Sequence, residues 1–190
     1  KLAQIEHKLG IKSTYFLRLH SEMYNLFEKS IVDRINKIIL LGHRIGLHFE
    51  YSFYDIISTK ELTKKLQLER TIIQDLFNTK IDVFSFHNPE TGGAIQINKN
   101  LIAGMINTYG KTILSDYHYC SDSNGYWRFE RLSDLINEKK YRKLHILIHP
   151  EWWQHKAMSP KKRIKRCIDE RSKRTFQLYS KITKDSGRKN

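Results

Sequence analysis

Three histidines stand where an apolar, strand-like run of the chain comes to its end: His48, His87 and His149. The chain turns after each of them, in two cases at a proline, Pro89 or Pro150. In a barrel of parallel strands the carboxyl ends of the strands meet at one mouth, which holds the active site. Three imidazoles at that mouth predict a metal site, or a metal site with an acid/base group beside it.

Two acidic residues are placed to act on these histidines. Glu50 follows His48 by two residues on the same face, so it is expected to orient an imidazole or to bind the metal itself, unless it is a solvated loop acid. Asp122, in a polar and turn-rich loop, is expected to hydrogen-bond His149 and hold it protonated. An Asx turn is the competing interpretation of Asp122.

Several other residues fit a substrate site. Trp152 and Trp153 directly follow the last strand, where their flat rings could stack on a sugar, although closing a barrel end is equally consistent with them. Arg128 is expected to clamp a carboxylate or phosphate of the substrate. His20 and Tyr24 follow the first expected strand at the same mouth.

The remaining reactive side chains are not expected to form a nucleophilic site. His43 stands at the start of a strand, far from the expected mouth, and is predicted to hydrogen-bond backbone groups. There is no GxSxG motif, no glycine-rich phosphate loop and no CxxC pair, which favours attack by an activated water. Cys120 and Cys167 lie far apart, as expected for a buried thiol and a helical surface thiol in a reducing compartment.

Strand-like and helix-like stretches alternate along the chain. Strands are expected at 12–19, 44–49, 81–86, 112–115 and 144–149, and helices at 1–9, 29–41, 59–78, 98–108, 131–138 and 160–184. Strands that alternate with helices of this length predict a parallel α/β sheet, closed or nearly closed, in one domain over residues 1–184. Residues 185–190 are expected to be a disordered tail. The first helix also calls for a strand before it, which this sequence does not contain.

The positive charge gathers at the C-terminal end. The net charge is +14, and residues 154–190 carry 13 Lys or Arg against 3 Asp or Glu. A basic run over 161–174 could bind nucleic acid or a membrane surface. Because Ile164, Ile168 and Phe176 interrupt the basic residues, a docked helix with a solvated basic face is the favoured interpretation. No apolar run approaches the roughly 20 residues that a membrane span needs.

Three segments together resemble a known family. GIKSTYF over residues 10–16 is similar to the family's GIKATFF strand, GHRIGLH over 42–48 to its GHEIGNH motif, and His149 on its strand to its terminal LxxH. The family is that of the polysaccharide deacetylases (NodB-homology, carbohydrate esterase 4-like), in particular a divergent branch from surface-polysaccharide and O-antigen clusters. The resemblance covers nearly the whole chain, and GHxIGxH is its most specific part.

The resemblance implies an irregular (β/α)7 barrel, lacking its first strand in this sequence, that hydrolyses an N-acetyl group on an amino sugar in bacterial surface polysaccharide biosynthesis. It implies a divalent metal, Zn²⁺ by the histidine count, with His48 and His87 as ligands and His149 as general acid supported by Asp122. Ser52 stands where the family has its second metal histidine, and His87 is expected to replace it. The family's base and metal aspartates belong to a strand that would precede Lys1.

The expected partner is an amino sugar or polysaccharide, without a specific nucleic acid. The expected location is cytoplasmic, with peripheral membrane contact through the basic C-terminal helix as an open alternative. A catalytically inactive carbohydrate-binding relative is the alternative function, in which Trp152, Trp153 and Arg128 bind glycan without turnover.

Overall fold

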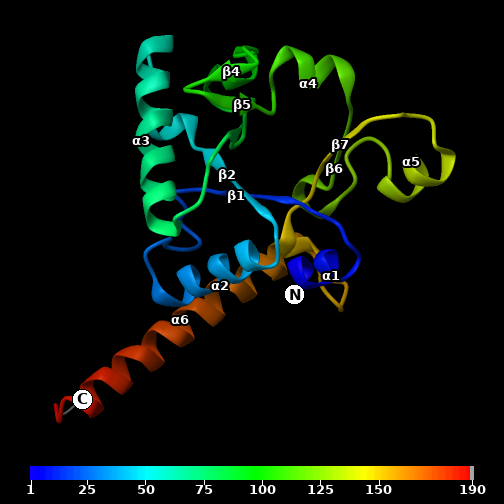
Figure 1. Cartoon of the computed structure of the whole chain (residues 1–190). Coiled ribbons are helices and arrows are strands. Elements are labelled where there is room, and N and C mark those ends of the chain that lie inside the picture. The colour runs from blue at the N-terminus through cyan, green and yellow to red at the C-terminus, as the bar shows by residue number, and fades with distance from the viewer. Residues whose placement is uncertain (189–190) are drawn as a thin grey trace. The chain divides into compact units, whose positions relative to one another are not determined.

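The computed structural model describes residues 1–188, apart from the side chains at positions 91 and 92, and divides the chain into two compact units (Figure 1). Unit 1 holds residues 1–119 and 139–145, and unit 2 holds residues 120–138 and the chain from Ile146 onward. The single domain expected over residues 1–184 stays a prediction.

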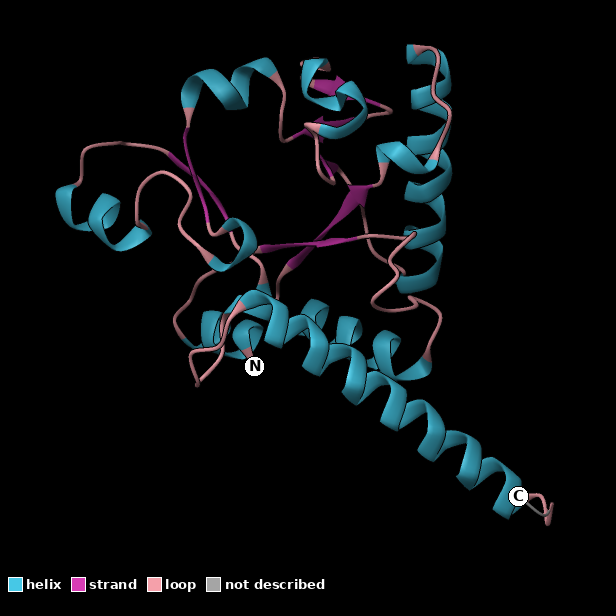
Figure 2. Ribbon diagram, turned by 180° about the vertical axis from the view of Figure 1, so that it is seen from behind, coloured by secondary structure: helices cyan, strands magenta, loops and turns pink. Residues whose placement is uncertain are grey.

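The described residues form six α-helices (Figure 2): α1 Leu2–Lys8, α2 Lys29–Leu40, α3 Thr59–Phe77, α4 Lys111–Asp116, α5 Leu132–Glu138 and α6 Pro160–Asp185. Local signals set the ends of the longest helix of unit 1. The Ser58 hydroxyl accepts the backbone N–H of Glu61 at the start of α3, and Asn78 ends the helix in the left-handed conformation. The sequence therefore predicted this helix to within one residue.

Within residues 1–188, seven strands form two sheets: β1 Thr14–Leu17, β2 Arg44–Phe49, β3 Val83–Phe86, β4 Leu101–Ile102, β5 Met105–Asn107, β6 His118–Ser121 and β7 Leu144–Leu147. The larger sheet has the order β1-β2-β3-β5-β4, and only its last pair is antiparallel. β6 pairs with β7. The expected α/β class with a mainly parallel sheet is confirmed.

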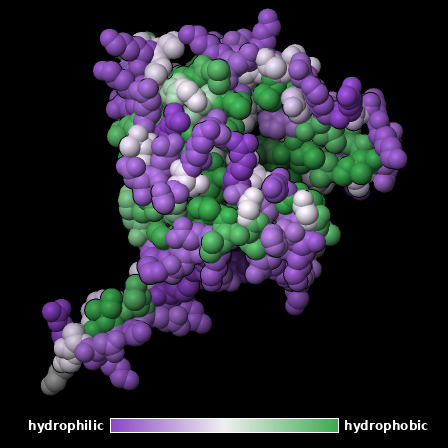
Figure 3. All heavy atoms as spheres, viewed as in Figure 1, coloured by the Kyte–Doolittle hydropathy of each residue, from purple (hydrophilic) through white to green (hydrophobic). Residues whose placement is uncertain are grey.

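The surface of α6 differs from the expected one. Ile168 and Phe176 are exposed, so the expectation that these two side chains dock against the protein is wrong. Apolar side chains are visible near the C-terminal end of α6 in Figure 3. The helix continues to Asp185, so the predicted tail begins one residue too early, and its residues 189–190 lie outside the described part of the chain. No helix within residues 1–188 is both long enough and apolar enough to cross a bilayer.

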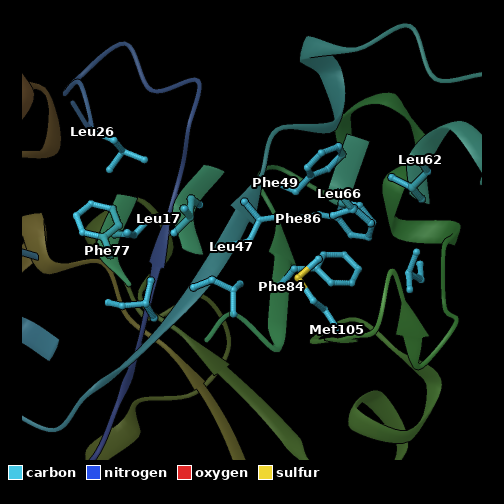
Figure 4. Close-up of a cluster of buried hydrophobic side chains, with 14 of the residues drawn as sticks. Leu17, Leu26, Leu47, Phe49, Leu62, Leu66, Phe77, Phe84, Phe86 and Met105 are labelled. Atoms are coloured by element: carbon cyan, nitrogen blue, oxygen red, sulfur yellow. The ribbon is translucent and has the colours of Figure 1, made fainter. Parts of the chain in front are cut away.

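The core of unit 1 forms around β2, which lies between β1 and β3 and is packed by α2 and α3 (Figure 4). Leu47 and Phe49 of β2 and Phe84 of β3 are fully buried, as is Leu66 of α3. A central parallel strand must bury both of its faces, which is why β2 is apolar almost throughout. At Gly46 a Cβ would come within 2.6 Å of the Phe16 ring on β1, so the close approach of these strands requires glycine.

Two neighbouring predictions are wrong. The helix expected at 98–108 is the β4–β5 hairpin, whose two turn residues, Ala103 and Gly104, have φ values of +54° and +72°. A two-residue turn of this kind brings buried residues of the two strands close together in sequence, which imitates helical spacing. The strand expected at 112–115 is helix α4, which has Gly110 at its N-cap.

Candidate functional site

Polar side chains gather where the first three parallel strands of unit 1 end. Arg18 directly follows β1, His48 and Glu50 lie at the end of β2, and His87 directly follows β3. The register pairs Leu17 with Leu47 and Phe49 with Phe86, so the carboxyl ends of the strands lie side by side. We call Arg18, His48, Glu50 and His87 the strand-end cluster.

His87 is the centre of the strand-end cluster. Its Nδ1 lies 3.2 Å from Nε2 of His48, and the two rings are nearly perpendicular at 84°. Its Nε2 lies 2.6 Å from Arg18 Nη1 and 3.5 Å from Glu50 Oε2. Arg18 and Glu50 form an ion pair at 3.2 Å, and the Ser52 hydroxyl donates to the other Glu50 oxygen at 2.6 Å. Glu50 therefore lies beside an imidazole, as expected for a carboxylate that orients a histidine.

The contact with Arg18 determines where His87 carries its proton. A guanidinium can only donate hydrogen bonds, so Nε2 of His87 accepts and a neutral His87 ring has its proton on Nδ1. That proton points at Nε2 of His48, which accepts it. The arrangement is a donor chain from Arg18 through His87 to His48.

The histidine pair also fits two positions around a zinc ion. Two imidazole nitrogens bound tetrahedrally at about 2.0–2.1 Å stand roughly 3.3 Å apart, close to the observed 3.2 Å between His48 Nε2 and His87 Nδ1. Metal binding would move the His87 proton to Nε2, next to Glu50, and would require Arg18 to withdraw. Within residues 1–188 no group of three or more His, Cys, Asp or Glu is placed to hold a metal.

A second polar group of unit 1 surrounds a fully buried acid, Glu69 of α3. The Tyr54 hydroxyl donates to Glu69 Oε1 at 2.9 Å. Nε2 of His20 lies 2.9 Å from the Tyr54 oxygen and 3.2 Å from the same Glu69 oxygen. The other oxygen, Oε2, is buried with no hydrogen-bond partner among the described residues. His20 is stacked on the ring of Phe53 at 3.5 Å, so it is positioned by its neighbours in unit 1.

Burial drives both members of this group toward their neutral forms. It raises the pKa of Glu69 to about 7, against a smaller lowering by the Tyr54 hydrogen bond. Burial also lowers the pKa of His20. Sequence reasoning missed Glu69, yet a signal was present: it stands in the apolar stripe of α3, between Leu66 and Ile73.

Unit 2 contains the contact expected between Asp122 and His149. Asp122 follows β6 and is buried, and His149 follows β7 at the start of the 3₁₀ turn η4, Pro150–Trp152. Asp122 Oδ1 accepts both the backbone N–H of His149 at 2.9 Å and its ring Nδ1 at 2.8 Å. Asp122 Oδ2 accepts the indole N–H of Trp153 at 2.9 Å. The expected hydrogen bond is confirmed.

The Asp122 carboxylate fixes the chemistry of the His149 ring. Its hydrogen bond raises the pKa of His149, against a lowering by burial. Because Nδ1 donates to Asp122, Nε2 is the nitrogen that can give or take a proton. The side chain of His149 is 34% exposed. The pair has the geometry of a general acid held by a buried carboxylate.

The other predicted residues have different surroundings. Trp153 is 49% exposed, whereas Trp152 packs near Gly125 and under the Arg163 guanidinium, 5.7 Å away. Arg128 lies over the ring of Phe129. The Tyr24 hydroxyl accepts the backbone N–H of Arg18. The stacking wall expected from the two tryptophans is therefore available mainly at Trp153.

His43 is structural, as the sequence indicated. Its ring is buried between α1 and β1, with Nε2 2.9 Å from the Ala3 carbonyl and Nδ1 accepting the backbone N–H of Ser13 at 3.2 Å. Both nitrogens are used by the backbone, which leaves none for chemistry.

Unit 2 also contains an open cavity of about 630 Å³. It is lined by Gly125, Tyr126, Lys162, Arg163 and residues 157–160. None of the residues predicted for catalysis, metal or substrate lines it, so it adds nothing to the candidate site.

No family model matches the chain, and no curated protein matches it either.

Proposed function

We propose that the chain is a metal-dependent deacylase that hydrolyses an N-acetyl or related amide group on an amino sugar of a surface polysaccharide. The proposal includes the closed (β/α) barrel implied by the family resemblance. It assigns Zn²⁺ to His48 and His87 in unit 1 and proton donation to His149 in unit 2.

The observation that carries the proposal is the hydrogen bond between Asp122 and His149. Amide hydrolysis must protonate a poor amine leaving group, which calls for an acid that is charged near neutral pH. The 2.8 Å hydrogen bond raises the pKa of His149 and leaves Nε2 as the nitrogen that transfers the proton. When bound, a divalent metal would polarise the acyl oxygen and lower the pKa of a water molecule.

The first test is acetate release from N-acetylglucosamine oligomers by the chain and, where its gene encodes residues upstream, by the extended form. We expect His149→Gln to reduce kcat/KM at least 100-fold, within the usual range for a general acid. His155→Gln, at an exposed histidine of the same unit, should leave the rate unchanged. Full activity in His149→Gln would refute the assigned acid.

The metal assignment has a separate readout. Zinc affinity, measured by competition with a chromophoric chelator, should fall at least tenfold in His48→Ala and in His87→Ala. His155→Gln is again the control. Unchanged zinc affinity in both variants would exclude the pair as ligands, whatever the result with the sugar.

One observation favours the alternative of a glycan-binding protein without turnover. Arg18 places a cation 2.6 Å from His87, where a metal centre would normally have a carboxylate or carbonyl. In that case Trp153 would supply a stacking surface. Binding of the same oligomers in calorimetry, without acetate release and with Trp153→Ala weakening it, would support this function over the deacylase.

A further inference from the structure

The C-terminal half of α6 has an unusual composition. Residues 171–184 contain five basic side chains and no acidic one. They also contain Phe176, Leu178, Tyr179 and Ile182, each between 56% and 70% exposed. Large apolar side chains exposed this closely together mark an interaction surface more often than a solvated one. We call residues 171–184 the distal segment.

The apolar side chains and four of the five basic residues lie on opposite sides of the distal segment, while Arg171 falls within the apolar arc. At 3.6 residues per turn, the four apolar side chains fall within an arc of about 160°. Four of the basic residues fall within an arc of about 100° on the other side: Lys173, Arg174, Lys181 and Lys184. An amphipathic helix of this kind, with Lys and Arg on its polar face, is typical of helices that lie in a membrane interface.

The first half of α6 is attached within its own unit. Arg163 donates to the Trp152 carbonyl at 2.6 Å, and Arg166 donates to the side chain of Gln154. The acids Asp169 and Glu170 pair with Lys165 and Arg166 one turn earlier. These contacts all involve residues before 171, and the distal segment itself contains no acid. Figures 1 and 2 show the end of α6 running away from η4, to which its start is attached.

We propose that the distal segment binds the surface of an anionic lipid bilayer, with its apolar face among the acyl chains and its basic residues at the headgroups. A second copy of the chain is a poorer occupant, because it would cover the apolar face but leave the basic residues on the opposite side without an anionic partner. A nucleic acid would attract the basic face but leave the apolar side chains in water. Only a bilayer satisfies both faces.

The experiment is co-sedimentation of the full chain with vesicles of phosphatidylcholine alone or mixed equally with phosphatidylglycerol. We expect binding at least tenfold tighter to the anionic vesicles, because basic residues near an anionic surface add to the affinity, and a weakening as salt is raised. The double variant Phe176→Gln with Ile182→Gln should weaken binding to anionic vesicles at least tenfold. Circular dichroism checks that α6 stays folded.

Matched controls come from α3. Leu68→Gln removes an exposed apolar side chain there and Lys60→Gln an exposed charge, and neither should change vesicle binding. Binding that survives the double variant would reduce the effect to adsorption of a polycation and overturn the proposal, as would equal competition by duplex DNA. A dimer in sedimentation velocity without vesicle binding would assign the apolar face to a second copy and overturn it as well.

Discussion

Each unit places an imidazole beside a buried carboxyl group, and the two pairs are built in opposite ways. In unit 2 the carboxylate of Asp122 receives three N–H donors, from the backbone and ring of His149 and from Trp153. In unit 1 one oxygen of Glu69 is shared by Tyr54 and His20, and the other has no partner among the described residues. The two pairs differ in the number of hydrogen-bond donors to the carboxyl group, and not in burial alone.

The difference decides which charges the pairs can hold. In unit 2 the hydrogen bond from Asp122 is the main cause of the raised pKa of His149. Around Glu69 the loss of water dominates, which raises the pKa of the acid to about 7 and lowers that of His20. A histidine next to a carboxyl group is therefore not by itself an ion pair. The number of hydrogen-bond donors to the carboxyl group decides whether the histidine pKa is raised or lowered.

The largest effect is expected when the donors around Asp122 lose their acceptor. Asp122→Ala leaves three N–H groups unpaired in a mostly buried position and should destabilise the protein by about 4 kcal/mol, at about 1–1.5 kcal/mol for each. Urea denaturation followed by tryptophan fluorescence measures this loss. The pKa of His149, followed by NMR titration, should fall toward the ordinary value.

The control for this change is Asp134→Ala, which removes an exposed acid of the same unit. It should alter stability by less than about 0.5 kcal/mol. An Asp122→Ala protein as stable as Asp134→Ala would mean that the three bonds to Asp122 contribute nothing, and the comparison of the two pairs would fail.

The second effect concerns pH and Glu69. A pKa raised from 4.5 to about 7 means that the folded protein holds a proton that the unfolded chain releases, so stability is lost as pH rises through this window. At about 1.4 kcal/mol per pKa unit the loss approaches about 3 kcal/mol. In Glu69→Gln this contribution disappears, so the stability of the wild type relative to the variant should fall by that amount between pH 5 and pH 8.

Asp75→Asn, an exposed acid on the same helix, is the matched control and should show no such dependence. The stability difference between wild type and His20→Gln, measured over the same pH range, tests whether His20 and Glu69 act on each other. His20 should show the opposite pH dependence, because its lowered pKa adds stability as pH rises toward 6.5. If the difference in unfolding free energy between the wild type and Glu69→Gln is constant between pH 5 and pH 8, Glu69 is ionised throughout this range.

Much of this arrangement was predictable from local signals. The bounds of β2 were predicted to the residue because an apolar run follows Gly42, which ends the turn after α2 at a φ of +83°. The contact of Asp122 with His149 followed from two strand ends and a turn-rich loop. The β4–β5 hairpin was missed because Ala103 takes a positive φ that alanine rarely adopts, which left Gly104 as the one turn residue of a typical type.

The residues that contact the predicted histidines were harder to predict from the sequence. Arg18 directly follows β1, and nothing in its spacing indicates that it contacts His87, which follows β3 two strands away in the sheet. Such contacts depend on which strands are adjacent, and strand order is a tertiary property. Glu69 could have been found, because an acid in an apolar helical stripe must be neutralised or paired when the helix packs.

The smallest predicted effect compares His87 with His149. The two histidines occupy the same place at the end of a parallel strand, yet His87 faces the Arg18 cation and His149 faces the Asp122 anion. If His87 binds zinc, Arg18→Gln should raise zinc affinity about tenfold, since a nearby positive charge at an intermediate dielectric opposes a second one by about 1.4 kcal/mol or more. Chelator competition measures this, with Arg44→Gln, on the same sheet, as the control. An unchanged affinity would mean that Arg18 withdraws freely to Glu50, and a lower one would mean that Arg18 supports the metal-binding form of the pair.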